Sequence, residues 1–278
     1  MDVHLGEVTC PSGELVVVDG GYLGLWSGDG SPLDLDPEVL GRLPDAEIDG
    51  NVAHRELARR CARVGGGEFS LCNVPAVAVG GLPVDRLLAV VARPVEDDSG
   101  WESFRVVGAD APVHRSVRLG EIGVDWARIA FGDADALAYW RHEEAIDDLA
   151  DVAFWGAAEQ EAAAVFAAPL LDTPGEEGVH GWTDLPIRDA AERAQTITDW
   201  RDENAARRLM VDFRPHSHHW QVMRGVRASG HGAGMVDVGG AWLLCAMTSW
   251  GDGFFPVFAD LDDADGLVAV RVVLSEDA

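Results

Sequence analysis

The sequence predicts an α+β fold that is rich in strands, with antiparallel sheets and a helical segment in the middle of the chain. Three observations lead to this prediction. Short β-branched runs that end in Asp, Gly or Pro dominate residues 1–130, and apolar residues recur at helical spacing within 131–209. Short apolar runs separated by Asp-Gly turns then return over 210–278. Period-two runs indicate strands, whereas apolar spacings of three and four indicate helices.

The first 130 residues contain a succession of predicted strands. Glu14–Asp19 is β-branched and is followed by the turn pair Gly20-Gly21. One helix is expected to interrupt the strands at about 52–63, with Asn51 as its N-cap. Further strands are predicted near 22–26, 68–72, 75–79, 85–93, 102–108 and 121–130.

The central segment predicts three helices. Over 134–150 the apolar residues fall on one helical face, and His142 lies on that face, where we interpret it as a core or interface histidine. An alanine-rich run predicts a second helix over about 156–167. A third is predicted over about 187–209, since Pro186 suits a first helical turn.

The C-terminal segment predicts a three-stranded antiparallel meander. Its strands are Ala241–Thr248, Phe254–Ala259 and Leu267–Leu274, and they are separated by Gly-Asp-Gly and Asp-Gly turns. No linker is long or polar enough to mark a boundary, so we expect one domain over 1–278. Short matches around Trp26 and Trp250 do not establish a repeat of fixed period.

Charge is the most unusual feature of the composition. The net charge is −27, and all 21 basic residues are arginines. So negative a chain is not expected to bind nucleic acid or an anionic membrane surface, because both need cationic side chains. It would instead attract a basic protein partner. The alternative is that the acidic residues are spread over a solvated face and serve solubility alone.

Location and redox state follow from what the sequence lacks. It has no apolar run near the roughly 18 residues of a membrane span and no basic N-terminus followed by an apolar core, so we expect a cytoplasmic protein. The cysteines form no CxxC pair, and we interpret them as reduced, mostly buried thiols. They are Cys10, Cys61, Cys72 and Cys245.

The sharpest chemical signal is His216-Ser217-His218-His219. On a strand, His216 and His218 would project from one face, as two metal ligands must. His231 lies across a glycine-rich turn and is the candidate for a third ligand of Zn²⁺ or Fe²⁺, which could activate water. The alternative is a polar strand surface that holds no cofactor, and both interpretations stay open.

Two glycine-flanked turns carry the candidate residues for partner binding. Trp26 and Asp29 belong to the first turn, and Trp250 and Asp252 to the second. Aromatic residues at loop tips often anchor interfaces. The alternative is that the tryptophans cap the core and that the Asp-Gly pairs are ordinary turns.

Several segments are similar in order to a known bacterial family. Residues 248–257 (Thr-Ser-Trp-Gly-Asp-Gly-Phe-Phe-Pro-Val) resemble the end of the family catalogued as domain of unknown function 4241. Ser12–Asp19 resembles its opening strand, and Gly123-Val124-Asp125 resembles its midpoint. The resemblance implies a β-rich α+β fold. It implies no activity and no catalytic residues.

Two functional hypotheses follow. The first is a non-enzymatic binding protein, for example an immunity-type inhibitor of a basic toxin, and it rests on the charge and on the absence of GxSxG, GxxxxGK and HExxH motifs. The second is a metal-dependent enzyme that uses His216, His218 and His231. The sequence indicates no oligomeric state.

Overall fold

The structure is a computed structural model that describes residues 1–43, 46–96, 99–203 and 206–275. The chain divides into two compact units. We call residues 1–140 and 231–278 the sandwich unit, and residues 141–230 the inserted unit. The prediction of a single domain over 1–278 stays a prediction, since the compactness of each unit does not test whether the two fold separately.

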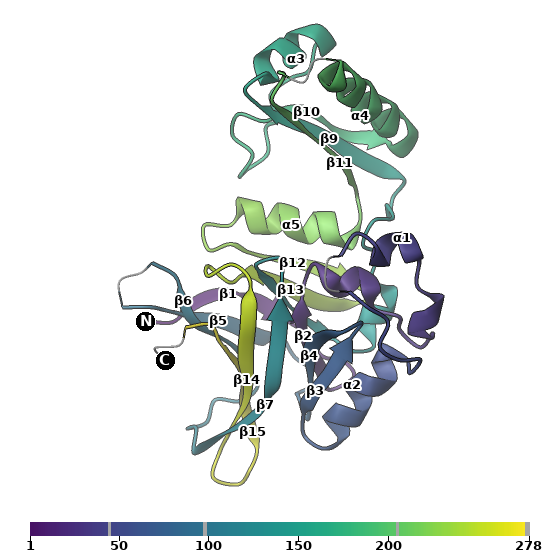
Figure 1. Ribbon diagram of the computed structural model, residues 1–278. Helices are drawn as coiled ribbons and strands as arrows, with labels where there is room; N and C mark the ends of the chain where they lie inside the picture. The colour runs from purple at the N-terminus through teal and green to yellow at the C-terminus, as the bar shows by residue number, and fades with distance from the viewer. Residues whose placement is uncertain (44–45, 97–98, 204–205, 276–278) are drawn as a thin grey trace. The chain divides into compact units, whose positions relative to one another are not determined.

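The sandwich unit contains two six-stranded antiparallel sheets (Figure 1). In order, the first consists of β1 (Val3–Val8), β5 (Leu88–Pro94), β6 (Trp101–Val107), β15 (Leu267–Val273), β14 (Gly253–Leu261) and β7 (Arg115–Val124). The second consists of β12 (Ala233–Val238), β13 (Ala241–Met247), β8 (Arg128–Asp133), β2 (Glu14–Asp19), β4 (Val74–Gly80) and β3 (Gly67–Leu71). Apolar side chains from both sheets form one core, which includes Leu15, Phe104, Ile122, Phe131 and Val257.

Short helices complete the sandwich unit. They are η1 (Tyr22–Leu25), η2 (Pro32–Asp34), α1 (Pro37–Leu40), α2 (His54–Arg63) and η3 (Ala136–Tyr139). Helix α2 lies against β3 and β4 (Figure 1). Ala58 and Ala62 are buried in that contact, and a Cβ at Gly80 would lie 2.3 Å from the carbonyl oxygen of Ala62. Only glycine permits so close an approach of helix and strand.

The sandwich unit contains the same arrangement of strands twice. The series β1, β2, β3, β4, β5, β6 corresponds to β7, β8, β12, β13, β14, β15, because each pairing within the first series recurs within the second. The two copies join through β2 with β8 and β6 with β15. Each junction pairs a strand with its own counterpart in antiparallel fashion, as a local two-fold axis requires.

Individual residues follow the same correspondence. Gly6 and Gly120 adopt φ angles of +150° and +153° at equivalent positions of β1 and β7. Asp19 and Asp133 end β2 and β8, and each carboxylate accepts N–H bonds from the turn after its strand and from the loop between the first two strands of the other copy. Asp19 accepts from Gly21, Asp125 and Trp126, and Asp133 accepts from Ser12, Asp135 and Ala136.

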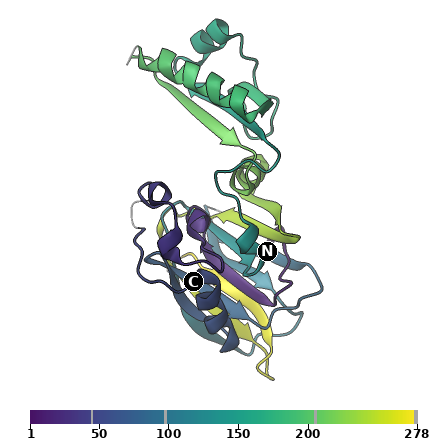
Figure 2. The same ribbon diagram turned by 90° about the vertical axis from the view of Figure 1, so that its right-hand side faces the viewer.

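The inserted unit interrupts the second copy. Its sheet has the order β10 (His180–Pro186), β9 (Leu149–Gly156), β11 (Leu209–Pro215) and is antiparallel. Helices α3 (Glu159–Phe166) and α4 (Ile187–Asp202) cover one face, around a core that includes Phe154 and Ile197 (Figure 2). Helix α5 (His218–Ala228) follows β11.

The β-rich α+β class with antiparallel sheets is confirmed, but the central segment is less helical than predicted. The helix predicted over 134–150 is wrong: only η3 forms, residues 142–148 are mostly bends, and β9 begins at Leu149. Asp148 has a φ of +60°, which a right-handed helix excludes. Helix α3 lies within the predicted 156–167, whereas α4 ends at Asp202 rather than at 209. Residues 204 and 205 of the predicted helix lie outside the described residues.

The three C-terminal strands form where predicted, but the meander is wrong. Strand β13 belongs to the second sheet, whereas β14 and β15 pair in the first. The turn between β13 and β14 contains Ser249 and Gly251, with φ angles of +66° and +79°. This turn takes the chain from one sheet to the other, so only β14 and β15 form a hairpin. The segment 210–278 also contains α5, which was not predicted.

The cysteines are free thiols, and three of them are buried. Burial raises the pKa of the Cys72 thiol to about 11 and that of Cys245 to about 12. Such thiols stay protonated and pack as small apolar groups. Every helix in the described part of the chain falls short of the length and apolar character that crossing a bilayer would require.

Candidate functional site

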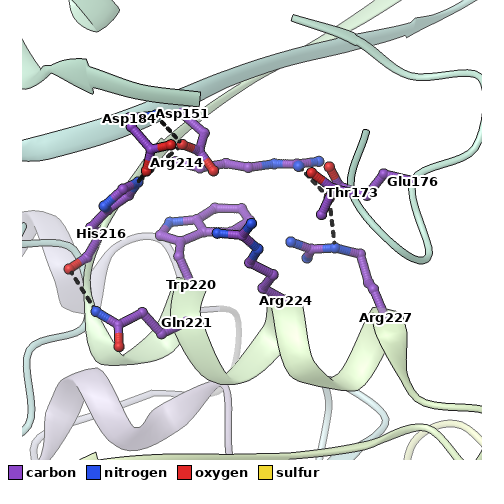
Figure 3. Close-up of a pocket in the computed structure, with 10 residues that line it drawn as sticks. All are labelled: Asp151, Thr173, Glu176, Asp184, Arg214, His216, Trp220, Gln221, Arg224 and Arg227. Atoms are coloured by element: carbon purple, nitrogen blue, oxygen red, sulfur yellow. Dashed lines mark hydrogen bonds and ion pairs between the residues drawn. The ribbon is translucent and has the colours of Figure 1, made fainter. Parts of the chain in front are cut away.

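The candidate site is a pocket of about 290 Å³ in the inserted unit (Figure 3). Strand residues line one side, a loop before β10 lines an end, and α5 lines the opposite side. The lining residues are Asp151, Thr173, Glu176, Asp184, Arg214, His216, Trp220, Gln221, Arg224 and Arg227. Nearly all of these side chains are polar or charged, so the pocket suits a polar ligand.

His216 lies just after β11 and is held on both sides. Its backbone N–H donates to Leu149 at 3.0 Å, and its carbonyl accepts from the N–H of Ile146 at 3.0 Å. Its Nδ1 lies 3.0 Å from Asp147 Oδ2, and its Nε2 lies 3.0 Å from Asp151 Oδ1. The two backbone hydrogen bonds therefore fix the position of His216. The contact of Nδ1 with Asp147 fixes the direction in which Nε2 points.

Asp184 completes a group of three potential metal ligands. Its Oδ1 lies 4.0 Å from His216 Nε2, and the ligand atoms of Asp151, Asp184 and His216 all lie within 4.8 Å of one another. Asp184 sits at a β-bulge in β10 with a φ of +56°, and its N–H donates to Asp151 Oδ1 at 2.9 Å. A bulge of this kind redirects a side chain out of the strand's alternation, often at functional sites.

Electrostatics couples His216 to its carboxylates. Burial by itself would lower the pKa of the imidazole, but hydrogen bonds to Asp151 and Asp147 outweigh it and raise the pKa above its ordinary value. Burial works against ionisation of Asp147 as well, and its hydrogen bond with His216 nevertheless lowers the pKa of that carboxyl. In the absence of a cation, the ring is therefore stabilised as an imidazolium between carboxylates.

The other half of the pocket is rich in arginine. Arg214 and Glu176 are buried, with Arg214 Nη1 2.5 Å from Glu176 Oε1. Arg227 Nε lies 2.9 Å from the same oxygen. Arg214 also contacts Asp212 at 3.2 Å. Burial lowers the pKa of Arg227, and the neighbouring Arg214 lowers it further, so the two guanidiniums compete for one carboxylate.

Trp220 separates the two halves of the pocket. The guanidinium carbons of Arg214 and Arg227 lie 5.7 Å and 6.0 Å from the centre of its ring. Trp220 belongs to the first turn of α5. Its backbone N–H donates to the Oγ of Ser217, the N-cap residue, at 3.2 Å. The cap thus places the indole ring, since it determines where the helix begins.

Of the predicted histidine ligands, only His216 belongs to this group. His218 is in α5 rather than on a strand, and its Nδ1 accepts the N–H of Arg141 at 2.8 Å. His54, which begins α2, accepts the N–H of Ser27 through Nδ1 in the same way. The shared-face prediction for His216 and His218 is therefore wrong, because Ser217 begins a helix.

His231 lies in the sandwich unit, and its ring centre lies 6.2 Å from that of Trp101. The group of Asp151, Asp184 and His216 does not include it. His142 lies in the inserted unit and stacks on His219 at 4.2 Å, and it is not part of a helix.

The predicted partner-binding residues lie at turns with different exposures. Trp26 is buried against His54 and Phe69, which agrees with the alternative that it caps the core. Trp250 is 46% exposed, and its indole N–H donates to the Trp101 carbonyl at 2.6 Å.

The two aspartates at these turns make contacts within the chain. Asp29 pairs with Arg55 at 2.6 Å. Asp252 is exposed, and its Oδ1 accepts the N–H of Ala127 at 3.2 Å. Both contacts fit turn residues, and whether either aspartate also meets a partner stays a prediction.

Most of the pocket was missed from sequence. One signal was present: Trp220, Arg224 and Arg227 recur at helical spacing after Ser217, a good N-cap residue. Asp151 and Asp184 had no such signal, because the bulge that brings them together has no sequence signature.

No family model matches the sequence, and searches of the curated proteins and of the solved structures found no match either. The resemblance to domain of unknown function 4241 therefore stays a hypothesis.

Proposed function

We propose that this protein is a metal-dependent enzyme whose Asp151, Asp184 and His216 hold a divalent cation such as Zn²⁺ or Fe²⁺. The observation that carries the proposal is the mutual distance of the three ligand atoms, all within 4.8 Å, at the edge of a polar pocket. One imidazole and two carboxylates form a ligand set that suits these ions.

The contact of His216 Nδ1 with Asp147 supports the proposal. In metal sites the ligating histidine usually donates its other N–H to a carboxylate, which fixes the tautomer and makes the free nitrogen more basic. Here Asp147 is that carboxylate, at 3.0 Å, and Nε2 is the nitrogen directed at Asp151 and Asp184. A bound cation would replace the proton that Nε2 and Asp151 otherwise share, and it would supply activated water for hydrolysis.

The position of the group in the chain gives further support. Asp151, Asp184 and His216 all lie between Arg141 and His218, where the second copy of the sandwich arrangement carries its extra segment. The repeated strands form the scaffold, so a function specific to this protein is expected where the copies differ.

Metal content and affinity test the proposal. We expect about one Zn²⁺ or Fe²⁺ per chain by mass spectrometry of untagged protein, lost in His216→Ala and Asp151→Asn. Asp147→Asn should weaken zinc binding by roughly 10- to 100-fold, because it removes only the orienting contact. His231→Ala serves as the control and should retain the metal.

Two results would contradict the proposal. Wild-type protein that binds no divalent cation in titration calorimetry would exclude a metal centre. Loss of metal in His231→Ala with retention in Asp151→Asn would return the ligands to the histidine cluster predicted from sequence.

A second candidate function is binding of a basic protein partner. The net charge of −27 favours it, and exposed Trp250 beside Asp252 offers an aromatic anchor next to a carboxylate. An immunity-type inhibitor is one protein of this kind. The two proposals rest on different residues, because Trp250 and Asp252 belong to the sandwich unit and the pocket belongs to the inserted unit.

A further inference from the structure

The arginine half of the pocket is positively charged within a strongly acidic protein. Three guanidinium groups, those of Arg214, Arg224 and Arg227, line it. Arg214 and Arg227 share Glu176, and Arg214 also contacts Asp212. Among the residues that the structure describes, Arg224 makes no ion pair. The guanidiniums therefore outnumber the carboxylates that neutralise them.

Geometry directs this charge toward the pocket. Arg224 and Arg227 are one helical turn apart on α5, and both side chains rise from the helix into the pocket, where Arg227 reaches Glu176 (Figure 3). Residues three apart on a helix share a face, so the two groups can contact one ligand together. Arg214 is buried and held by Glu176, which gives the cluster a fixed member.

We propose that Arg224 and Arg227, together with Arg214, bind the phosphoryl group of a small phosphate monoester. This proposal names the substrate class of the metal-dependent enzyme and rests on that function. A phosphoryl group carries three terminal oxygens, so it can contact more than one guanidinium and still face the ligands on the other side of Trp220. A carboxylate has only two oxygens.

The volume of the pocket and the net charge of the protein limit the class of substrate. A volume of about 290 Å³ lies at the small end of ligand pockets. It fits a phosphorylated metabolite of a few carbons, whereas a nucleic acid polymer is disfavoured by the net charge of −27.

The metal half and the arginine half should be coupled. Without a cation, Asp151 and Asp184 repel a phosphate dianion, whereas a divalent cation neutralises them. Phosphate should therefore bind at least about tenfold more tightly to zinc-loaded protein than to metal-free protein, since this difference corresponds to only about 1.4 kcal/mol.

Calorimetric titration with inorganic phosphate tests the proposal, using metal-free and zinc-loaded full-length protein. We expect binding by the wild type that weakens at least about tenfold in Arg224→Gln and in Arg227→Gln, because each loses a charge-assisted hydrogen bond. Arg224 is exposed, so its substitution should leave the fold intact. The control is Arg188→Gln, an exposed arginine on α4 outside the pocket, which should leave phosphate affinity unchanged.

Three outcomes would overturn the proposal. They are no phosphate binding by the wild type in either form, equal binding by wild type and Arg224→Gln, and malonate binding as tight as phosphate, which would assign a carboxylate ligand. If the wild type binds no metal, the proposed enzyme fails by itself. Phosphate binding to metal-free protein that is lost in Arg224→Gln would then still support the arginine site.

Discussion

At the scale of single residues, the clearest features are carboxylates whose partners are distant in sequence. Asp19 is fully buried and accepts N–H bonds from Gly21, Asp125 and Trp126. Burial raises its pKa from 3.8 to about 6, even though these hydrogen bonds oppose the shift. The carboxylate of Asp19 thus links the two copies. Because its ionised form is disfavoured by burial, its contribution to the free energy of folding depends on pH.

Asp19→Asn should reveal this pH dependence. The raised pKa makes the folded state bind a proton more readily, so this contribution to stability is complete below about 3.8 and is lost as the pH rises through about 6. The free energy of unfolding of wild type relative to Asp19→Asn should therefore increase by about 1 kcal/mol from about pH 7 to about pH 5. Urea unfolding at both pH values measures it.

A matched comparison separates this effect from the general charge of the protein. Asp172→Asn changes an exposed aspartate, and its difference from wild type should be the same at both pH values. A difference for Asp19→Asn that is also constant would show that Asp19 is fully ionised over this range.

At the scale of elements, β10 determines whether the candidate metal ligands meet. A Cβ at Gly181 would lie 1.9 Å from the carbonyl oxygen of Val152 on β9, and its φ is +157°. The close approach of β9 and β10 precedes the bulge that turns Asp184 toward Asp151. The pairing of these strands is thus part of the candidate site.

Gly181→Ala should destabilise the inserted unit and weaken the proposed binding of Zn²⁺. We expect a loss of at least about 3 kcal/mol, because both the backbone contact and the φ angle oppose a side chain. Gly178→Ala is the control: its φ is +85°, but nothing lies within 4 Å, so the cost should be about 1 kcal/mol. Urea unfolding and zinc titration measure both variants, and equal losses would show that the contact with Val152 is unimportant.

Helix α5 illustrates how one cap changes a prediction. The polar run at 216–219 is compatible with a strand surface, but Ser217 caps a helix whose Val222 and Val226 are buried. His218 then becomes a helix residue that accepts a backbone N–H, as His54 does in α2. Two histidines predicted to share a ligand face therefore differ in role.

At the scale of the whole molecule, the chain consists of a duplicated scaffold and an insertion. The copies share strand order and special backbone positions, but the spacing between equivalent residues changes after the insertion. A search for a fixed period therefore misses the repeat. The charge is a second property of the whole molecule, and it allows a prediction about partners.

Capture on immobilised protein tests the basic partner. We expect a protein of pI above about 9 to be retained at low salt and released as salt rises, because exposed charges are screened within about 10 Å at 0.1 M. Retention should fall in the double variant Trp250→Ala, Asp252→Asn and persist in Trp242→Ala, which changes another exposed tryptophan. Failure to retain any basic protein, or retention independent of salt, would count against this function.

The amino-acid sequence by itself determined the α+β class, most strand positions, α3 and the start of α4. These follow from local periodicity and turn residues, which act within a few positions along the chain. It also determined the negative net charge, which disfavours binding of nucleic acid. It identified His216 but not Asp151 and Asp184, whose carboxylates lie beside it.

Only the tertiary structure decided which strands share a sheet, that the strand arrangement occurs twice, and that His216 meets Asp151 and Asp184. Strands β13 and β14 are adjacent in sequence but lie in different sheets, and Asp151 and His216 are 65 residues apart. The physical reason is that pairing and ligand geometry depend on long-range packing and on strained positions such as Asp184, which leave no periodic trace in the chain.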